Sequence, residues 1–501
     1  MNDSISDLLV VGGGINGAGI ARDAAGRGLS VTLVERDDLA AHTSSQSTKL
    51  IHGGLRYLEH YEFRLVSEAL AEREVLLKLA PHLIEPLAFV LPHEPHLRPA
   101  WMIRTGLFLY DHLGGRMSLP KSFGVKLDGS RWGAGLQSRF ARGFVYADAR
   151  VDDARLVIAN AMSARDLGAM IRPRTTLVSA RRDGPVWRAQ LESGGKRSEV
   201  RARAIVNAAG PWVKDLLDRL HDDPGIAGVR HVKGSHIIVP RVHPEEHAYI
   251  LQNADQRIVF VIPYQQKYSL IGTTDIAVDS YADPHIAQDE IDYLLQLVNA
   301  YLAAPLTKAD IVWSYSGVRP LYDDGAADPS AVTRDYVLKL EPGSEPMQPP
   351  LLSIFGGKIT TYRKLAEAAL AELAPFFPTI KPAWTRTAPL PGGDFAGGDR
   401  AGLFAAVCAR YPHLPFELLR ALAGRHGART FELLGDASTP ADLGADFGAH
   451  LTAREIEWMV RDEWAMTADD ILWRRTKCGL PMSERERDAV REHLETHHAL
   501  A

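Results

Sequence analysis

The chain has 501 residues and a formal net charge of -5, from 57 basic and 62 acidic residues. This weak imbalance gives no global reason to expect nucleic-acid binding, and the length predicts about three domains at ~150 residues each. Two cysteines, Cys408 and Cys478, cannot form a disulfide framework or a zinc site, and their scarcity fits a reducing compartment. No apolar run approaches the ~18 residues of a spanning helix, so we expect no integral membrane segment. We also expect no metal site, since the cysteines offer no zinc-ligand spacing.

The chain opens with one compact βαβ unit. Leu8 to Val11 predicts a buried parallel strand, Asn16 to Gly26 has apolar residues at helical spacing, and Ser30 to Val34 predicts a second strand. Such a unit is expected to have a right-handed crossover.

The loop between that strand and helix contains G-x-G-x-x-G in the context that a dinucleotide motif requires. Gly12 permits the tight turn, Gly14 lets the backbone approach a pyrophosphate, and Gly17 allows close helix–strand packing. Glu35, which closes the second strand, can accept hydrogen bonds from an adenosine ribose. It disfavours NADP but does not separate NAD from FAD. The predicted contacts in this unit are Gly12, Gly14, Ile15, Asn16, Gly17 and Glu35.

Further elements follow along the chain. Helices are predicted from Glu62 to Leu79 and from Asp152 to Leu167, and Ala100 to Leu113 is amphipathic. Strand patterns occur in Met170 to Asn207, in Ile258 to Thr274 on either side of a turn at 265–267, and in Leu352 to Phe355, which a helix through Leu373 follows. From residue 390 the pattern becomes mainly helical, which predicts a separate C-terminal domain.

Five motifs carry a family resemblance. They are Thr43–Tyr57 (TSSQSTKLIHGGLRY), Lys233–His236 (KGSH), Ile271–Asp275 (IGTTD), Tyr315–Pro320 (YSGVRP) and Phe355–Lys364 (FGGKITTYRK). In composition and order they resemble the FAD-dependent glycerol-3-phosphate dehydrogenases, over almost the whole chain. The resemblance implies an α/β fold: a glutathione-reductase-like FAD-binding Rossmann domain interrupted by a mixed-sheet substrate cap, and an α-helical C-terminal domain. The expected ranges are 1–60, 140–210 and 315–385 for the FAD domain, 61–139 and 211–314 for the cap, and 390–501 for the helical domain.

The resemblance also implies FAD contacts beyond the first loop. Without the resemblance, the hydroxyl run from Thr43 to Thr48 would be interpreted as a solvated turn. Asn207–Gly210 could equally be a turn that ends a strand or a second contact with the nucleotide. Gly356–Gly357 precedes a predicted helix, whose N-terminus could stabilise negative charge at the flavin's pyrimidine end. The added contacts are Thr43, Ser44, Ser45, Ser47, Lys49, Leu50, His52, Gly53, Gly54, Ala209, Gly210, Gly357, Lys358 and Thr360.

For the substrate, glycerol 3-phosphate, the resemblance implies a phosphate site built from cations. The expected substrate contacts are Arg56, Tyr57, Thr273, Arg319, Arg334 and Lys358. Arg suits bidentate phosphate binding, and Lys acts as a point charge. A base must remove the C2 hydroxyl proton, and we predict His236 for this role, with His52 as its rival. The predicted catalytic set is therefore His236, Arg319, Lys358 and Arg56.

The resemblance further implies a membrane quinone as electron acceptor, a homodimer, and a cytoplasmic protein bound peripherally to the inner face of the cytoplasmic membrane. Ala100–Leu113 has the composition of an interfacial helix, although a core helix of the cap is an equal interpretation. Trp473–Lys477 (WRRTK) is a second basic and aromatic candidate, which we interpret as a solvated face of the helical domain.

Three alternatives are weighed against this function. A glycerol-3-phosphate oxidase would reduce oxygen, but its branch is associated with inserted sequence that this chain lacks. An amine or amino-acid oxidase would need a carboxylate pocket, whereas the SGVRP segment favours the phosphate family. A flavin-binding protein without turnover is disfavoured because Arg56, His236, Arg319 and Lys358 occur together. No D-x-D-x-D-G loop is present, so we predict no calcium dependence.

Overall fold

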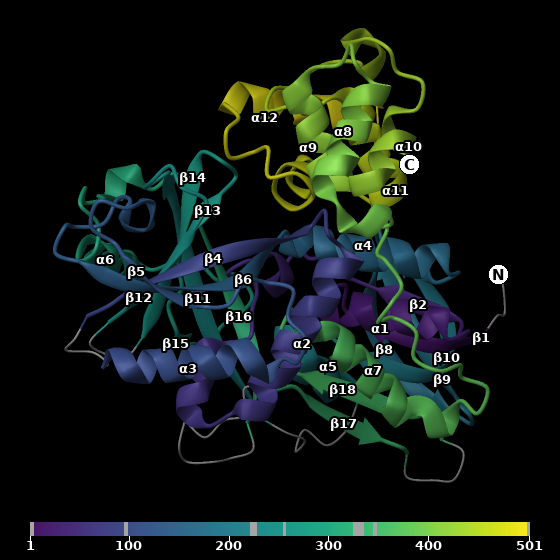
Figure 1. Ribbon diagram of the computed structural model, residues 1–501. Helices are drawn as coiled ribbons and strands as arrows, with labels where there is room; N and C mark the ends of the chain where they lie inside the picture. The colour runs from purple at the N-terminus through teal and green to yellow at the C-terminus, as the bar shows by residue number, and fades with distance from the viewer. Residues whose placement is uncertain are drawn as a thin grey trace.

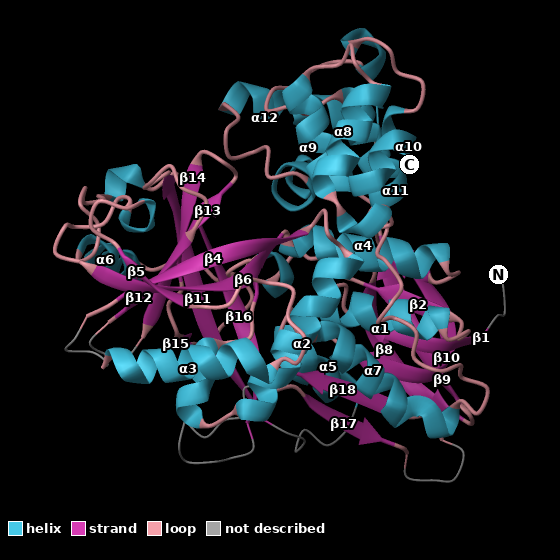
Figure 2. Ribbon diagram, in the orientation of Figure 1, coloured by secondary structure: helices cyan, strands magenta, loops and turns pink. Residues whose placement is uncertain are grey.

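Two β-sheets with covering helices and a helical cluster at the C-terminal end make up the protein (Figures 1 and 2). The computed structural model describes residues 5–94, 99–220, 228–253, 257–323, 335–343 and 348–497. Arg334, one of the predicted substrate contacts, lies outside the described residues.

The first sheet has eight strands, six of them in the order β17-β18-β10-β1-β2-β7. The strands are β1 (Ile5–Val11), β2 (Val31–Val34), β7 (Met170–Arg172), β10 (Lys196–Asn207), β17 (Val337–Glu341) and β18 (Leu351–Phe355), with the hairpin β8 (Thr176–Asp183) and β9 (Val186–Ser193) extending from β10. The pairs of β1 with β2 and with β10, of β10 with β18 and of β2 with β7 are parallel, while the edge strand β17 is antiparallel.

Both faces of this sheet are buried because consecutive residues of β1 point to opposite sides. Leu8 and Val10 join a core with helices α1 (Ile15–Gly26), α4 (Asp153–Asp166) and α7 (Tyr362–Leu373). Leu9 joins a second core with the β8–β9 hairpin and α5 (Val213–Leu220). The carboxyl end of β1 is thereby fixed from both sides, and the first glycine loop begins there.

The second sheet has ten strands, eight of them in the order β15-β11-β14-β13-β12-β4-β6-β3, with β16 beside β11 and β5 beside β6. The strands are β3 (Leu50–Ile51), β4 (Ile84–Pro92), β5 (Phe123–Lys126), β6 (Arg142–Val151), β11 (Gly228–Pro240), β12 (Ala248–Gln252), β13 (Ile258–Tyr264), β14 (Tyr268–Gly272), β15 (Ile276–Ala277) and β16 (Trp313–Asp323). Helices α2 (Phe63–Leu79) and α3 (Ala100–Leu113) pack on one face, and α6 (Gln288–Asn299) packs on the other.

The C-terminal region forms a helical cluster with its own core. It contains α8 (Arg400–Arg410), α9 (Phe416–His426), α10 (Thr430–Leu434), α11 (Ala453–Glu463), a π-helix (Asp470–Arg475) and α12 (Glu484–His497). Figure 1 shows this cluster above α4 and beside the tips of β13 and β14. Among the described residues, no helix combines the length and the apolarity needed to cross a bilayer.

The expected α/β fold class with two sheets and a helical C-terminal part is confirmed. The division into numbered domains stays a proposal. The second sheet contains β3, β6 and most of β16, which all fall in the ranges expected for the FAD domain.

One interpretation is wrong. Trp473–Lys477 is not a solvated basic face: the side chain of Arg475 is fully buried, Lys477 is nearly so, and both pair with aspartates outside the helical cluster.

Candidate active site

The first glycine loop has the geometry of a nucleotide site. Gly12 has φ +115°, and a Cβ there would lie 2.4 Å from the Ala208 carbonyl oxygen, while a Cβ on Gly17 would lie 1.9 Å from the Gly12 oxygen. These glycines are needed for the turn and for close helix–strand packing. A Cβ on Gly14 would meet only Ser44 Oγ, at 3.0 Å. The backbone at Gly14 is thus open to a ligand, as a pyrophosphate contact requires.

A cleft beside this loop collects several predicted cofactor residues. Its lining includes Gly12, Gly14, Glu35, Thr43, Ser44, Ala209 and Gly210, and its other walls include Arg36 and Trp212. The Arg36 guanidinium lies 4.0 Å from the centre of the Trp212 ring. The sequence motifs did not identify Arg36 or Trp212, because a single Arg or Trp carries no spacing signal.

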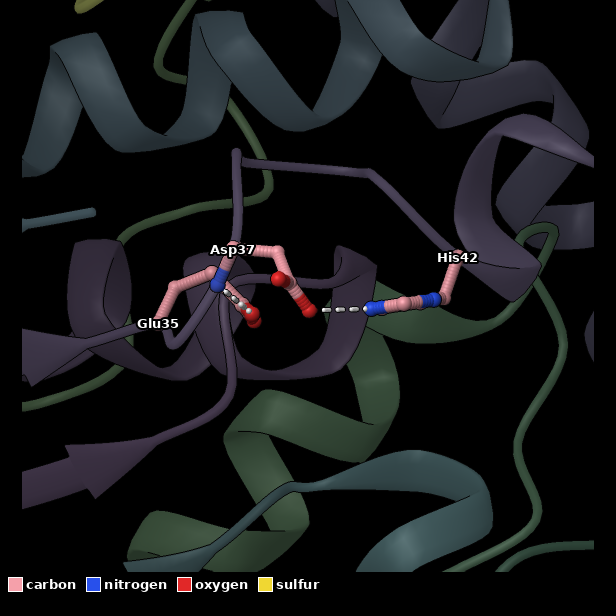
Figure 3. Close-up of side chains that lie close together, drawn as sticks. All are labelled: Glu35, Asp37 and His42. Atoms are coloured by element: carbon pink, nitrogen blue, oxygen red, sulfur yellow. Dashed lines mark hydrogen bonds and ion pairs between the residues drawn. The ribbon is translucent and has the colours of Figure 1, made fainter. Parts of the chain in front are cut away.

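Glu35 is fixed at the end of β2 by backbone donors. Its carboxylate accepts hydrogen bonds from Gly13 N at 2.6 Å and from Asp37 N at 2.9 Å. Burial raises the pKa of Glu35, and these two donors oppose the shift. Figure 3 shows His42 pointing at Asp37, and their hydrogen bond of 2.8 Å holds the pKa of Asp37 down at about 2. The loop that would contact the ribose is therefore held by its own polar contacts.

The hydroxyl run has divided roles. Thr43 Oγ1 donates to the Val318 carbonyl at 2.7 Å, and Ser44 Oγ accepts from Ile15 N at 3.0 Å. Ser47 and Lys49 turn the other way: the Ser47 hydroxyl and the Lys49 ammonium both donate to the buried carboxylate of Asp153, at 2.7 and 2.9 Å. Thr43 and Ser44 thus line the cleft, whereas Ser47 and Lys49 anchor the segment to the first turn of α4.

The glycine pair after β18 is packed against the first turn of α1. Gly356 and Gly357 both have positive φ, and Asn16 Nδ2 donates to the Gly356 carbonyl at 3.1 Å. The helix that follows begins only at Tyr362. The expected helix N-terminus is therefore not at the glycine pair, because Lys358–Thr361 forms an intervening turn.

His236 occupies a closed environment on β11. Its ring stacks on Tyr315 at 4.8 Å, and its Nε2 shares a 3.0 Å hydrogen bond with Thr48 Oγ1. Nδ1 is buried without a hydrogen-bond partner. Burial holds the pKa of His236 well below its usual value, and the positive charges of Lys49 and Arg319 lower it further. The imidazole is therefore neutral at neutral pH, with one ring nitrogen to serve as an acceptor.

Cations gather around the rival histidine, His52. Burial lowers the pKa of His52, and the nearby charges of Lys358 and Arg319 contribute, while Asp148 opposes them. The backbone N–H of His52 donates to Thr360 Oγ1 at 3.3 Å. Lys358, from the loop after β18, and Arg319, from β16, are thus brought near residue 52 although they lie far apart in the sequence.

The remaining predicted substrate contacts lie beside these cations. Lys358 Nζ lies 4.0 Å from the centre of the Tyr57 ring. A Cβ on Gly234 would lie 2.7 Å from Thr273 Oγ1 and 3.0 Å from Arg319 Nη2, so both groups approach the same glycine. Arg319 also pairs with Asp275 at 2.5 Å, and both side chains are partly exposed.

Arg56 carries an orphaned donor. Its Nε is buried without a hydrogen-bond partner among the described residues. An unpartnered guanidinium donor is costly to bury, and an anionic ligand would satisfy it.

A buried network that the sequence did not predict supports the Gly53 turn. Tyr110 OH accepts from Gly53 N at 2.8 Å and donates to Asp148, which also pairs with Arg73 at 2.6 Å. The three side chains come from α2, α3 and β6, and no local motif joins residues so far apart in sequence.

Comparison with known proteins identifies the family. Residues 7–348 match the model of the FAD dependent oxidoreductases, and residues 383–498 match the C-terminal domain of alpha-glycerophosphate oxidase. A glycerol-3-phosphate dehydrogenase of Pseudomonas aeruginosa is 55% identical over 99% of this chain and 96% of its own length. The aerobic glycerol-3-phosphate dehydrogenase of Escherichia coli is 54% identical over 97% of each chain.

This chain belongs to the FAD-dependent glycerol-3-phosphate dehydrogenase family. A solved family structure, the glycerol-3-phosphate dehydrogenase of Bacillus halodurans complexed with FAD, is 26% identical, with a TM-score of 0.74 over 99% of this chain and 95% of that one. FAD is the cofactor of this oxidoreductase, and the open backbone at Gly14 and the adjoining cleft fit it. Another relative, the D-erythritol 1-phosphate dehydrogenase of Brucella abortus, is 50% identical over 97% of each chain.

Proposed function

We propose that this enzyme oxidises sn-glycerol 3-phosphate to dihydroxyacetone phosphate and passes the electrons to a membrane quinone. The names of the relatives at 55% and 54% identity support the substrate. The observation that carries the proposal is the placement of two cations beside predicted substrate contacts: Lys358 lies over the Tyr57 ring, and Arg319 and Thr273 approach the same glycine.

These cations suit a phosphate dianion. Lys358 has no carboxylate partner among the described residues, and Arg56 has an orphaned buried donor, so both are free to bind an added anion. Arg319 would exchange its partly exposed partner, Asp275, for the substrate phosphate. In this arrangement the phosphate fixes one end of the substrate, and Tyr57 and Thr273 are close enough to the cations to contact its hydroxyl groups.

When bound, FAD supplies the acceptor for the hydride of C2. The protein's part is to remove the hydroxyl proton, and we assign this to Nδ1 of His236. Thr48 Oγ1 can donate to Nε2 or accept from it, and in the tautomer with the proton on Nε2 the unpartnered Nδ1 carries the lone pair that would accept the proton. Fixed positive charge on Arg319 and Lys358 would stabilise the developing alkoxide.

A lipid-soluble acceptor implies contact with a bilayer, and helix α3 is the surface we propose for it. The helix buries Ile103, Leu107 and Tyr110, while its other side exposes Trp101, Met102, Phe108 and Leu109. The exposed fractions of Trp101 and Phe108 are 67% and 62%. Large aromatic side chains left in contact with water, with the exposed Arg104 among them, are typical of a helix lying in the membrane interface.

Further parts of the proposal follow from the family. We place the enzyme in the cytoplasm, bound peripherally to the inner face of the cytoplasmic membrane, and we expect a homodimer. Sedimentation in detergent would measure the dimer.

The test of the acceptor and the substrate is anaerobic reduction of the bound flavin, followed by mixing with either a quinone analogue or oxygen. We expect glycerol 3-phosphate to bleach the flavin and the quinone to restore it faster than oxygen does. Equal reoxidation by oxygen would support the oxidase instead. One relative at 50% identity is a D-erythritol 1-phosphate dehydrogenase, so D-erythritol 1-phosphate is the second compound to test. If it bleaches the flavin faster than glycerol 3-phosphate does, it is the better candidate for the substrate.

A further inference from the structure

The segment Trp473–Lys477, here called the WRRTK segment, lies between the helical cluster and the rest of the molecule, with Arg475, Thr476 and Lys477 buried. It ends the π-helix Asp470–Arg475, an irregular form that is rare and frequent at functional sites. Trp473 stacks on Trp313 of β16, with ring centres 4.1 Å apart and an interplanar angle of 12°. Because water is largely excluded there, the positive charges of this segment need carboxylate partners within the protein.

The first counter-ion is Asp38. Arg474 donates to its carboxylate at 2.5 Å, and Arg475 donates to both of its oxygens, at 2.8 Å to Oδ1. Asp38 follows Glu35 in the loop of the nucleotide cleft, and Ala40 and Ala41 beyond it line that cleft. Two arginines of the helical cluster therefore hold the loop that carries one wall of the FAD site.

The second counter-ion is Asp152, a half-buried carboxylate that pairs with the buried Lys477. Asp152 caps α4, accepting from Arg155 N at 3.1 Å. The next residue, Asp153, is the one that binds Ser47 and Lys49 of the hydroxyl run. Lys477 is therefore linked to the hydroxyl run indirectly, through the first turn of α4.

Buried ion pairs contribute little net stability, because desolvation offsets their attraction, but they impose a definite geometry when both partners are present. Here Arg474 and Arg475 pair directly with Asp38 in the stretch 35–42, whereas Lys477 pairs with Asp152, whose neighbour Asp153 binds the stretch 43–49. We propose that the WRRTK segment positions these two stretches, so that the C-terminal domain sets the affinity for FAD. The proposal concerns the cofactor alone and does not depend on which alcohol is oxidised.

The test replaces Arg475 by Lys, which keeps the charge but loses the two-pronged contact with Asp38. The matched control is Arg429→Lys, because Arg429 donates two bonds, of 3.1 and 3.0 Å, to Glu432 within the helical cluster, and neither residue lines the FAD cleft. FAD is removed from each protein and titrated back, following the quenching of flavin fluorescence. We expect the dissociation constant of Arg475→Lys to rise about tenfold, and that of Arg429→Lys to stay within about twofold of the unmodified protein. An equal rise in both variants, or no rise in either, would overturn the proposal.

A second measurement needs no variant, and it decides the question if Arg475→Lys does not fold. Coupling between two sites is reciprocal, so FAD must also stabilise the segment that positions its site. We compare amide hydrogen exchange in the protein with and without FAD. The expected result is slower exchange on FAD loading in residues 470–478 as well as in 35–49, with α8 unchanged as the internal reference. Protection that stops at the cleft and leaves 470–478 unaffected would overturn the proposal.

Discussion

At the scale of single residues, the two histidines near the site differ in what surrounds them. His236 is enclosed by Tyr315, Thr48 and Gly272. The pKa of His52 is affected by the positive charges of Lys358 and Arg319, which we expect to bind the substrate phosphate. The sequence alone identified both as candidates from their motifs. It could not show their tautomers or charges, because these depend on contacts between β11, β14, β16 and the hydroxyl run.

Replacing His236 by Gln tests its role as base. Loss of a general base costs ~10²- to 10⁴-fold, and we expect the rate of flavin reduction to fall by that much while FAD binding stays the same. The matched control is His243→Gln, because His243 is also buried with an unpartnered Nδ1 but lies in the loop after β11. Stopped-flow absorbance measures the rates. If His52→Gln causes the large loss and His236→Gln does not, His52 is the base.

The pH dependence of the reaction follows from the low pKa of His236. Burial favours its neutral form, so the competent base persists as the pH falls through 6.5 and is lost only below that value. We therefore expect the rate of flavin reduction at saturating substrate to stay level from pH 8 to 6.5 and to decline at lower pH. A decline centred at the ordinary histidine pKa, absent in His236→Gln, would contradict the environment described for this residue.

Replacing Arg319 and replacing its partner Asp275 should change KM in different ways. Arg319→Met removes a charge-assisted contact with the substrate phosphate, worth ~1.5–3 kcal/mol, so KM should rise about tenfold to a hundredfold. Asp275→Asn removes the competing carboxylate and should leave KM unchanged or lower it. Steady-state kinetics with a dye acceptor measures both. A similar rise of KM in the two variants would mean that the ion pair itself, and not the free arginine, maintains the site.

At the scale of elements, the sequence patterns predicted the bounds of these helices to within one residue, but they did not predict which side chains are buried by distant elements. The helices predicted at 16–26, 62–79 and 152–167 occur at 15–26, 63–79 and 153–166. Their apolar spacing is a local property that survives folding. The WRRTK segment was misjudged because its aspartate partners lie more than 300 residues away, where no local pattern can reveal them.

Helix α3 gives the prediction at this scale. The double variant Trp101→Gln, Phe108→Gln removes two large exposed apolar side chains without touching the buried side of the helix. We expect binding to vesicles to weaken at least tenfold, because the apolar area that enters the interface is lost. Vesicle flotation measures this, and anaerobic flavin reduction should not change. Phe416→Gln is the control, since Phe416 is also exposed but lies in the helical cluster. Equal losses in control and variant would exclude α3 as the membrane contact.

At the scale of the whole molecule, the active site forms where segments from both sheets meet. The glycine loop follows β1 of the first sheet, Arg319 and His236 come from β16 and β11 of the second, and Lys358 follows β18 of the first. The sequence could predict the family, the cofactor and most of the candidate residues, because each sits in a compact motif. It could not predict the Asp148 network or the burial of the WRRTK segment, since both depend on how distant elements pack together.

We propose that these cations and a neutral histidine together make a site for a phosphorylated secondary alcohol. The most direct measurement is anaerobic mixing of the flavin-loaded enzyme with glycerol 3-phosphate or with glycerol, following flavin absorbance near 450 nm. We expect rapid bleaching by glycerol 3-phosphate and negligible bleaching by glycerol at the same concentration, because only the phosphate can bind the cations. Bleaching by both alcohols at equal rates, or by neither, would contradict it.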